Sequence, residues 1–320
     1  MNKESLIHQV FDVLEHAGFI TSKRCNIRPR SFDLAARRER ILLLLKVLAN
    51  IDGLNDETAR ELKQLAFYLL GHPLVVGEKA RDHYLETGVV YNRHGIPSIN
   101  ISTLYNHFVE NIPPLVYAGP GGLYVNLDGK KLQHARNLKK MSIGDLASKI
   151  GVSRRAISMY EEEEMDASVD NALKLEDILD TTLVNPIDIL KQKNIYSETL
   201  YKETYEELKI QEHSIFMRLT SLGFKVFPTT QAPFNAVSQE KDDKETTILT
   251  GVSKYSNTMI KRARLMSSIS VVTHTHSVFI IEGKSKSEQI DSTVLIEKTE
   301  LKKMEDSEDF IDLIQSYSNK

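Results

Sequence analysis

The chain has 320 residues, 41% of them hydrophobic and 27% charged, a balance typical of a folded protein with two or three domains. Its net charge is −3, and its single cysteine, Cys25, excludes an internal disulfide and a cysteine-based zinc site. No apolar stretch reaches membrane-spanning length, since the longest aliphatic run, Ile41 to Leu45, is followed by Lys46. The opening segment reads as an amphipathic helix rather than a signal peptide. We therefore expect a cytoplasmic protein that contacts no membrane.

Residues 1–112 predict an α/β domain, because the segment order is helix, strand, strand, helix, strand. We expect Asp33 on one strand and Lys46 at the end of the next. This placement resembles the restriction-endonuclease-like fold, which implies an aspartate and an acid-x-lysine triplet around a divalent cation. Leu44 stands where the second carboxylate belongs. We therefore predict a degenerate domain with no catalytic residue, metal or cofactor, in which Asp33 and Lys46 form a structural pair or contact DNA phosphate.

Residues 113–126 are interpreted as a linker. The stretch from Asn111 to Tyr124 gathers prolines and glycines within a short span, and no helix interior tolerates this composition. The glycines of AGPGG lack the lysine and the strand-loop-helix setting of a phosphate-binding loop. We therefore place the first domain boundary here.

Residues 127–195 predict five short helices, and Met141 to Glu161 is the most informative stretch. Ser142 followed by Asp145 indicates a capping box, Gly151 a sharp turn, and Ser153 the cap of the next helix. The spacing predicts a helix-turn-helix at about 142–161; the alternative is an ordinary helix pair in an all-α core. The residues expected on its inward face are Leu146, Ala147, Ile150, Val152, Ile157 and Tyr160. Leu132, Ala135 and Leu138 are expected to form the core face of the helix before it.

Positive charge is concentrated in the same stretch. Between Lys130 and Tyr160 eight lysines and arginines face a single carboxylate, Asp145, giving a formal charge of about +7. Such a segment within a slightly acidic chain is typical of a surface that binds DNA phosphate.

Five helices in this order resemble the DNA-binding domain of the lambda Cro and repressor family, over Leu127 to about Lys191. The resemblance implies that Arg136 pairs with Glu161 beneath the second helix of the motif. It also implies that this second helix faces base edges and that the start of the first helix meets phosphate. Here the loop after the motif, EEEEM, is acidic where the family often has a glycine. The candidate DNA-binding residues are Ser142, Ile143, Ser153, Arg154, Arg155, Ser158 and Met159.

Residues 196–320 predict a linker helix and a second α/β domain. Ser197 to Leu222 contains no proline or glycine, and this helix is the candidate for holding a homodimer together. The following segments repeat the order of the first domain, so that Asn235 takes the place of Asp33, and Thr250 or Gly251 that of Lys46. His274 and His276 are expected on one face of a strand, without the partners that a metal site requires.

The whole layout resembles a group of archaeal helix-turn-helix transcriptional regulatory proteins, with RSFDLAARRERILLLLKVLANID as the most similar stretch outside the helical domain. We therefore predict an α+β protein with a central lambda-repressor-like helical domain between two similar, degenerate α/β domains. The predicted function is a dimeric, sequence-specific regulator that binds double-stranded DNA and is not an enzyme. The alternative is a DNA-processing enzyme or its targeting subunit. No pattern specifies a small-molecule effector.

Overall fold

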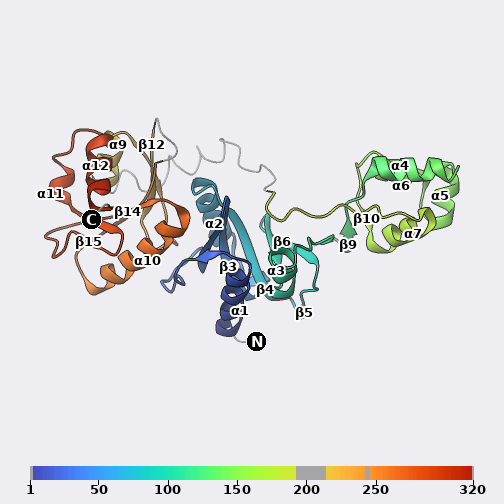
Figure 1. Ribbon diagram of the computed structural model, residues 1–320, viewed down its shortest axis with the longest axis horizontal. Coiled ribbons are helices and arrows are strands. Elements are labelled where there is room, and N and C mark those ends of the chain that lie inside the picture. Colours follow the sequence, from blue (N-terminus) through green and yellow to red (C-terminus); the bar gives the residue numbers. More distant parts are fainter. Residues whose placement is uncertain (1–2, 192–213, 242–245, 319–320) are drawn as a thin grey trace. The chain divides into compact units, whose positions relative to one another are not determined.

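The computed structural model describes residues 3–191, 214–241 and 246–318 (Figure 1). The described chain separates into two compact units. The first holds residues 3–13, 49–52 and 76–191, and the second holds residues 14–48, 53–75 and those from 214 onward. Within the described residues no helix is long and apolar enough to cross a membrane.

The N-terminal region is an α/β arrangement, as predicted. Its strands belong to a ten-stranded sheet of order β1-β2-β3-β4-β7-β6-β8-β9-β10, with β5 paired to β4, in which the last three strands come from residues 116–168. The run ILLLLKVLAN forms β3, and its central residues are buried because both faces of the strand are covered. The elements are α1 (Lys3–His16), β1 (Ile20–Thr21), β2 (Leu34–Arg38), β3 (Ile41–Asn50), α2 (Asp56–Tyr68), β4 (His72–Ala80), β5 (His83–Tyr84), β6 (Val89–Arg93), β7 (Ile96–Ile99) and α3 (Ile101–Phe108).

Residues 113–126 are not a plain connection. They form the hairpin β8 (Val116–Gly119) and β9 (Gly122–Val125), with Gly121 in the left-handed region at φ 86°. Strand β9 then pairs with β10 (Ala167–Ser168), which follows the predicted helix-turn-helix. The prolines and glycines thus mark a β-turn and its approach, in a segment that joins the sheet.

The described part of the helical domain, residues 127–191, contains four helices, and the expected fifth does not form over residues 181–191. The four are α4 (Gly129–Leu138), α5 (Ile143–Ile150), α6 (Arg154–Glu161) and α7 (Val169–Leu179). Backbone groups of residues 181–191 bond to distant segments and not along a helix. Val184 forms an isolated bridge with Leu127, and the amide of Ile187 donates to the carbonyl of Pro114. Leu138, expected in the core, is 70% exposed.

The described residues of the C-terminal region, 214–241 and 246–318, combine helices with a second sheet. This six-stranded sheet has the order β11-β12-β13-β14-β16-β15, which matches the order β1-β2-β3-β4-β7-β6 position by position. Most of the predicted helix over 197–222 lies outside the described residues. The elements are α9 (Ser214–Ser221), β11 (Phe224–Pro228), β12 (Ala236–Glu240), β13 (Thr247–Ser253), α10 (Asn257–Thr273), β14 (His276–Ile281), β15 (Gln289–Ile290), β16 (Thr293–Glu297), α11 (Lys298–Leu301) and α12 (Ser307–Ser318).

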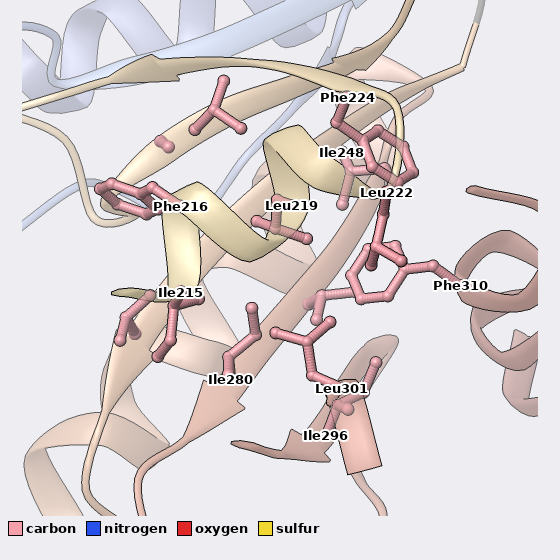
Figure 2. Close-up of a cluster of buried hydrophobic side chains, with 14 of the residues drawn as sticks. Ile215, Phe216, Leu219, Leu222, Phe224, Ile248, Ile280, Ile296, Leu301 and Phe310 are labelled. Carbon is pink, nitrogen blue, oxygen red and sulfur yellow. The ribbon is translucent and has the colours of Figure 1, made fainter. Parts of the chain in front are cut away.

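Helices α9 and α12 pack on one face of this sheet (Figure 2). Leu219 and Phe310 are fully buried, and the ring of Phe310 meets that of Phe224 edge-on at 5.4 Å. At about 25 cal/mol per Å² of apolar surface, burial of such a cluster supplies most of the driving force for folding this domain. Its buried members are Ile215, Phe216, Leu219, Leu222, Phe224, Val226, Ala236, Ile248, Val252, Val278, Ile280, Val294, Ile296, Leu301, Met304, Phe310 and Ile314.

Within the second unit, two segments contact each other through polar groups. We call residues 14–48 and 53–75 the N-terminal module, and residues 214–318 the C-terminal module. The carboxylate of Glu61 on α2 accepts bonds from the amide and hydroxyl of Thr230, at 2.9 and 2.7 Å, and from the amide of Gln231 at 2.7 Å. Glu61 is only 7% exposed, so a buried carboxylate with three donors joins the modules.

The two modules also bond each other reciprocally. Arg37 on β2 donates to the carbonyls of Val272 and Thr273 at the end of α10, at 2.6 and 3.0 Å. Gln239 on β12 donates to the carbonyl of Tyr68 at the end of α2, at 3.0 Å. Each strand therefore supplies a donor to the free carbonyls at the C-terminal end of the other module's helix.

Candidate DNA-binding surface

The turn between α5 and α6 is built from local signals in the sequence. The Ser142 hydroxyl accepts a bond from the amide of Asp145 at 3.1 Å, and the Asp145 carboxylate accepts from the amide of Ser142 at 2.9 Å. Hydrogen bonds from Ser142 lower the pKa of Asp145. Helix α5 ends at Gly151, whose φ of 81° is readily adopted only by glycine, and the Ser153 hydroxyl caps α6 through the amide of Ala156.

A small apolar core fixes the angle between the helices. Five of the six residues expected on the inward face are buried, and Val152 is half-buried against the same cluster. Because the core residues come from α4 to α7, the exposed face of α6 is held on a rigid support. The five buried residues are Leu146, Ala147, Ile150, Ile157 and Tyr160.

Arg136 and Glu161 form a bidentate pair beneath α6. The Nε and Nη2 atoms of Arg136 donate to the two carboxylate oxygens of Glu161, at 2.6 and 3.0 Å. The side chains are 10% and 5% exposed, and the bonds to Glu161 raise the pKa of Arg136. A further bond runs from Arg136 to the carbonyl of Met141 at 2.8 Å. The guanidinium thus ties the end of α6 to the residue before the N-cap of α5.

The predicted DNA-binding residues occupy the start of α5 and the outer side of α6. Four of them are exposed and three are half-buried, so each presents some surface to solvent. The exposed residues are Ser142, Ser153, Arg154 and Arg155, and the half-buried ones are Ile143, Ser158 and Met159.

Gly144, in the first turn of α5, makes room for Arg154. A Cβ atom at Gly144 would lie 2.9 Å from Nε of Arg154 and 3.2 Å from its Cζ. The guanidinium of Arg154 therefore lies over the start of α5, whereas Arg155 is exposed at the next position along α6. Gly144 was not among the residues predicted from the sequence; its signal there is a glycine inside a helix of strong amphipathic pattern.

The acidic loop after α6 supports the start of α4. The amide of Gly129 donates to the carboxylate of Glu163 at 3.2 Å. A Cβ atom at Gly129 would collide with the carbonyl of Glu161, so only glycine allows this approach of the two helices. The acidic loop, which stands where the lambda Cro and repressor family often has a glycine, therefore has a structural role in the domain.

The region that resembles a nuclease has its candidate residues turned inward. Asp33 is fully buried, and its carboxylate accepts from Nε of Arg30 at 2.7 Å and from the amide of Val47 at 2.8 Å. Lys46 is 8% exposed, and its Nζ donates to the carbonyl of Arg30 at 2.5 Å. Leu44, at the position of the second acid, is fully buried. No group of three or more potential metal ligands occurs among the described residues.

Asn235 occupies in the C-terminal module the environment that Asp33 has in the N-terminal module. Its Oδ1 atom accepts from the amide of Val252 at 2.9 Å and from Nη2 of Arg262 at 3.0 Å. The amide of Asn235 donates to the carbonyl of Thr250, as that of Asp33 donates to Leu45. Of the two predicted counterparts of Lys46, this register selects Gly251.

Gly251 cannot be replaced by a lysine without rearrangement. A Cβ atom at Gly251 would lie 2.6 Å from the ring of Phe279, and Phe279 is fully buried. The C-terminal module therefore lacks both the aspartate and the lysine of the nuclease pattern.

The remaining candidates are two histidines and a cysteine. His274 ends α10 with φ 56°, and His276 begins β14, so the two do not share a strand face as expected. Burial lowers the pKa of His276. Cys25 is buried, burial raises the pKa of its thiol, and its amide donates to the carbonyl of Asp33. The thiol is therefore not an activated nucleophile.

Known proteins from archaea are similar to this chain over nearly its whole length. A protein of Methanosarcina barkeri and one of Methanococcoides burtonii are each 55% identical, over 98% of this chain and 97% of their own length. A protein of Natronomonas pharaonis is 44% identical over 98% of both chains. Each carries the name "Putative HTH-type transcriptional regulatory protein", where HTH stands for helix-turn-helix.

Two family models match parts of the chain. The PD-(D/E)XK superfamily domain matches residues 3–114, which supports the nuclease-like fold expected for the N-terminal region. The helix-turn-helix family matches residues 132–184, which include α5 and α6. No solved structure matches the chain.

Proposed function

Because the chain belongs to the family of archaeal HTH-type transcriptional regulatory proteins, we propose that it is a regulator that binds specific sequences in double-stranded DNA. In this proposal α6 enters the major groove, and the start of α5 contacts phosphate. The observation that carries the proposal is the exposure of Arg154 and Arg155 at the first turn of α6, on a helix fixed from below by the Arg136–Glu161 pair.

Base reading is assigned chiefly to Arg155. An arginine that gives two hydrogen bonds to guanine discriminates between bases by about 1–3 kcal/mol. Selection of bound fragments from random duplex DNA should enrich one motif, and Arg155→Ala should remove the preference for one base pair of that motif. Lys174→Ala, at an exposed position of α7, is the matched control and should leave the motif unchanged. Failure to enrich any motif would reject sequence-specific binding.

The bound form is proposed to be a homodimer. Helix-turn-helix dimers bind half-sites about 34–36 Å apart, so the selected motif should be an inverted repeat with that spacing. Light scattering should give about twice the chain mass of 36.4 kDa. A monomer both free and on DNA would reject this part of the proposal.

We propose that the nuclease-like domain does not cut DNA. A hard divalent cation requires several oxygen ligands, and Asp33 is already engaged by Arg30 and by the amide of Val47. With Mg²⁺ or Mn²⁺, linear, supercoiled and branched DNA should therefore remain intact. Cleavage that disappears in Asp33→Ala would instead favour the DNA-processing enzyme.

We also propose that the C-terminal module is a second, more degenerate copy of the nuclease-like fold. The support is the shared order of six strands and the matching backbone bonds of Asp33 and Asn235, whose side chains accept from the amides of Val47 and Val252. Because neither copy retains a pair of carboxylates at this position, the two copies are assigned a structural and DNA-contacting role.

A further inference from the structure

Four exposed lysines lie at one edge of the sheet in the C-terminal module. The parallel strands β13 and β14 end at Ser253 and Ile281, and these two residues are register partners. The amide of Glu282 then donates to the carbonyl of Ser253 at 3.0 Å, so the two loops leave the sheet side by side. Helix α10 begins at the same edge, because it connects the end of β13 to the start of β14. We call Lys254, Lys261, Lys284 and Lys286 the lysine edge.

The lysine edge carries more basic than acidic side chains. Residues 246–281 contain no aspartate or glutamate, and residues 282–297 carry four acids, Glu282, Glu288, Asp291 and Glu297. Glu288 and Asp291 lie away from the edge, because the carbonyl of Glu288 accepts from the amide of Leu295 within β16 and Asp291 precedes the start of that strand. Glu297 is occupied by the amide of Ser285 at 2.8 Å. In the part of the chain that the structure describes, none of the four lysines forms an ion pair.

The same edge of a metal-dependent nuclease is negative, because its carboxylates hold the cation that faces the phosphate. Here the position of the aspartate is taken by Asn235, and its amide oxygen is bonded to Arg262. In the N-terminal region, the corresponding loop after β3 carries Asp52, which pairs with Arg93 at 2.7 Å. Among the described residues, the C-terminal edge thus carries an excess of cations, and such an edge attracts phosphate directly, without a metal.

We propose that the lysine edge is a second DNA-contacting surface, which binds the phosphate backbone of double-stranded DNA without reading its bases. This inference rests on the proposed DNA-binding function. Phosphate contacts carry no sequence information, so the edge should raise the affinity for the selected motif and for random DNA by the same factor.

The test compares two variants of the full-length chain that lose the same number of charges. The first is Lys254→Gln/Lys284→Gln/Lys286→Gln, and the control is Lys225→Gln/Lys302→Gln/Lys303→Gln, at three exposed positions outside the edge. Kd is measured on the selected duplex and on a random-sequence duplex across a series of salt concentrations.

The edge variant should bind both duplexes about tenfold more weakly at low salt, with an unchanged ratio between them. The slope of log K against log salt should become shallower by about 0.9 for each phosphate that the variant no longer neutralises. If the edge variant matches the control in affinity and slope, the inference is wrong.

The two proposals fail in different ways. If the wild-type chain shows no preference for any sequence, the proposed regulator function is wrong, while the comparison on random DNA still tests the edge. Arg155→Ala should lower the ratio between the two duplexes and leave the difference between edge variant and control intact.

Discussion

Gly144 is the residue whose role in the helix-turn-helix is least apparent from local rules. Alanine favours a helix interior over glycine by about 0.5–1 kcal/mol, so Gly144→Ala should keep or raise the stability of the domain. The new Cβ would meet Nε of Arg154 at 2.9 Å and displace the guanidinium. We therefore expect affinity for the selected motif to fall by up to about tenfold, a loss of about 1.4 kcal/mol.

A double-mutant cycle decides whether Arg154 carries this effect. In an Arg154→Ala background, the additional Gly144→Ala change should not alter Kd, because the displaced group is absent. A further loss of affinity in that background would show that Gly144 acts through another contact, such as one between the backbone of α5 and a DNA phosphate.

The Ser142–Asp145 cap makes the stability of α5 depend on pH. The pKa of Asp145 is lowered in the folded chain by the bonds from Ser142. Its contribution is therefore fully present above the unfolded pKa, about 3.9, and is lost as pH falls through the lower folded value. In Ser142→Ala the Asp145 pKa, followed by NMR, should rise toward the unfolded value. An unchanged titration would mean that the cap bond does not set the pKa.

At the scale of elements, the helices bounded by local capping and turn residues could be predicted from the sequence. Ser142, Gly151 and Ser153 set the ends of α5 and α6 through bonds to residues nearby in the sequence. The absent fifth helix is different, because Glu176 on α7 accepts bonds from the amides of Leu183 and Val184, at 2.6 and 3.2 Å. These contacts, with the bonds of 184 and 187 to more distant segments, compete with helix formation and leave no periodic signal in the sequence. The exposure of Leu138 at the end of α4 could not be predicted from the helical spacing either, because it depends on which segments pack against that helix.

Glu176 provides a test of how this return segment is held. Glu176→Ala leaves two partly buried amides without their acceptor, and we expect a loss of about 1–3 kcal/mol in unfolding free energy. Hydrogen exchange at Leu183 and Val184 should become faster. Asp177→Ala, at the exposed neighbouring position, should change neither quantity. Equal exchange in the two variants would show that the Glu176 carboxylate does not hold the segment.

At the scale of the whole molecule, the sequence was informative about segment order and uninformative about contacts between modules. The first helix of each region is followed by a Gly-Phe pair, and Gly18 and Gly223 both have positive φ, so the same local signal in the sequence marks the same turn in both places. The candidate pair Asp33 and Lys46 could also be identified from the sequence. Their burial and their hydrogen bonds to Arg30 could not be predicted, because both depend on tertiary packing. Glu61, which joins the modules, has no local signature beyond its place on a helix.

The bonds of Glu61 should make the two modules unfold together. Glu61→Ala removes the acceptor from three donors of Thr230 and Gln231, and we expect a loss of about 3 kcal/mol in unfolding free energy. Urea unfolding followed by hydrogen exchange in β3 and in β13 should be coincident in the wild-type chain and separate in the variant. Glu57→Ala, on the exposed side of α2, should cost less than about 1 kcal/mol and keep the transitions coincident. If the Glu61 variant also unfolds in one step with unchanged stability, the reciprocal bonds of Arg37 and Gln239 alone are sufficient to couple the modules.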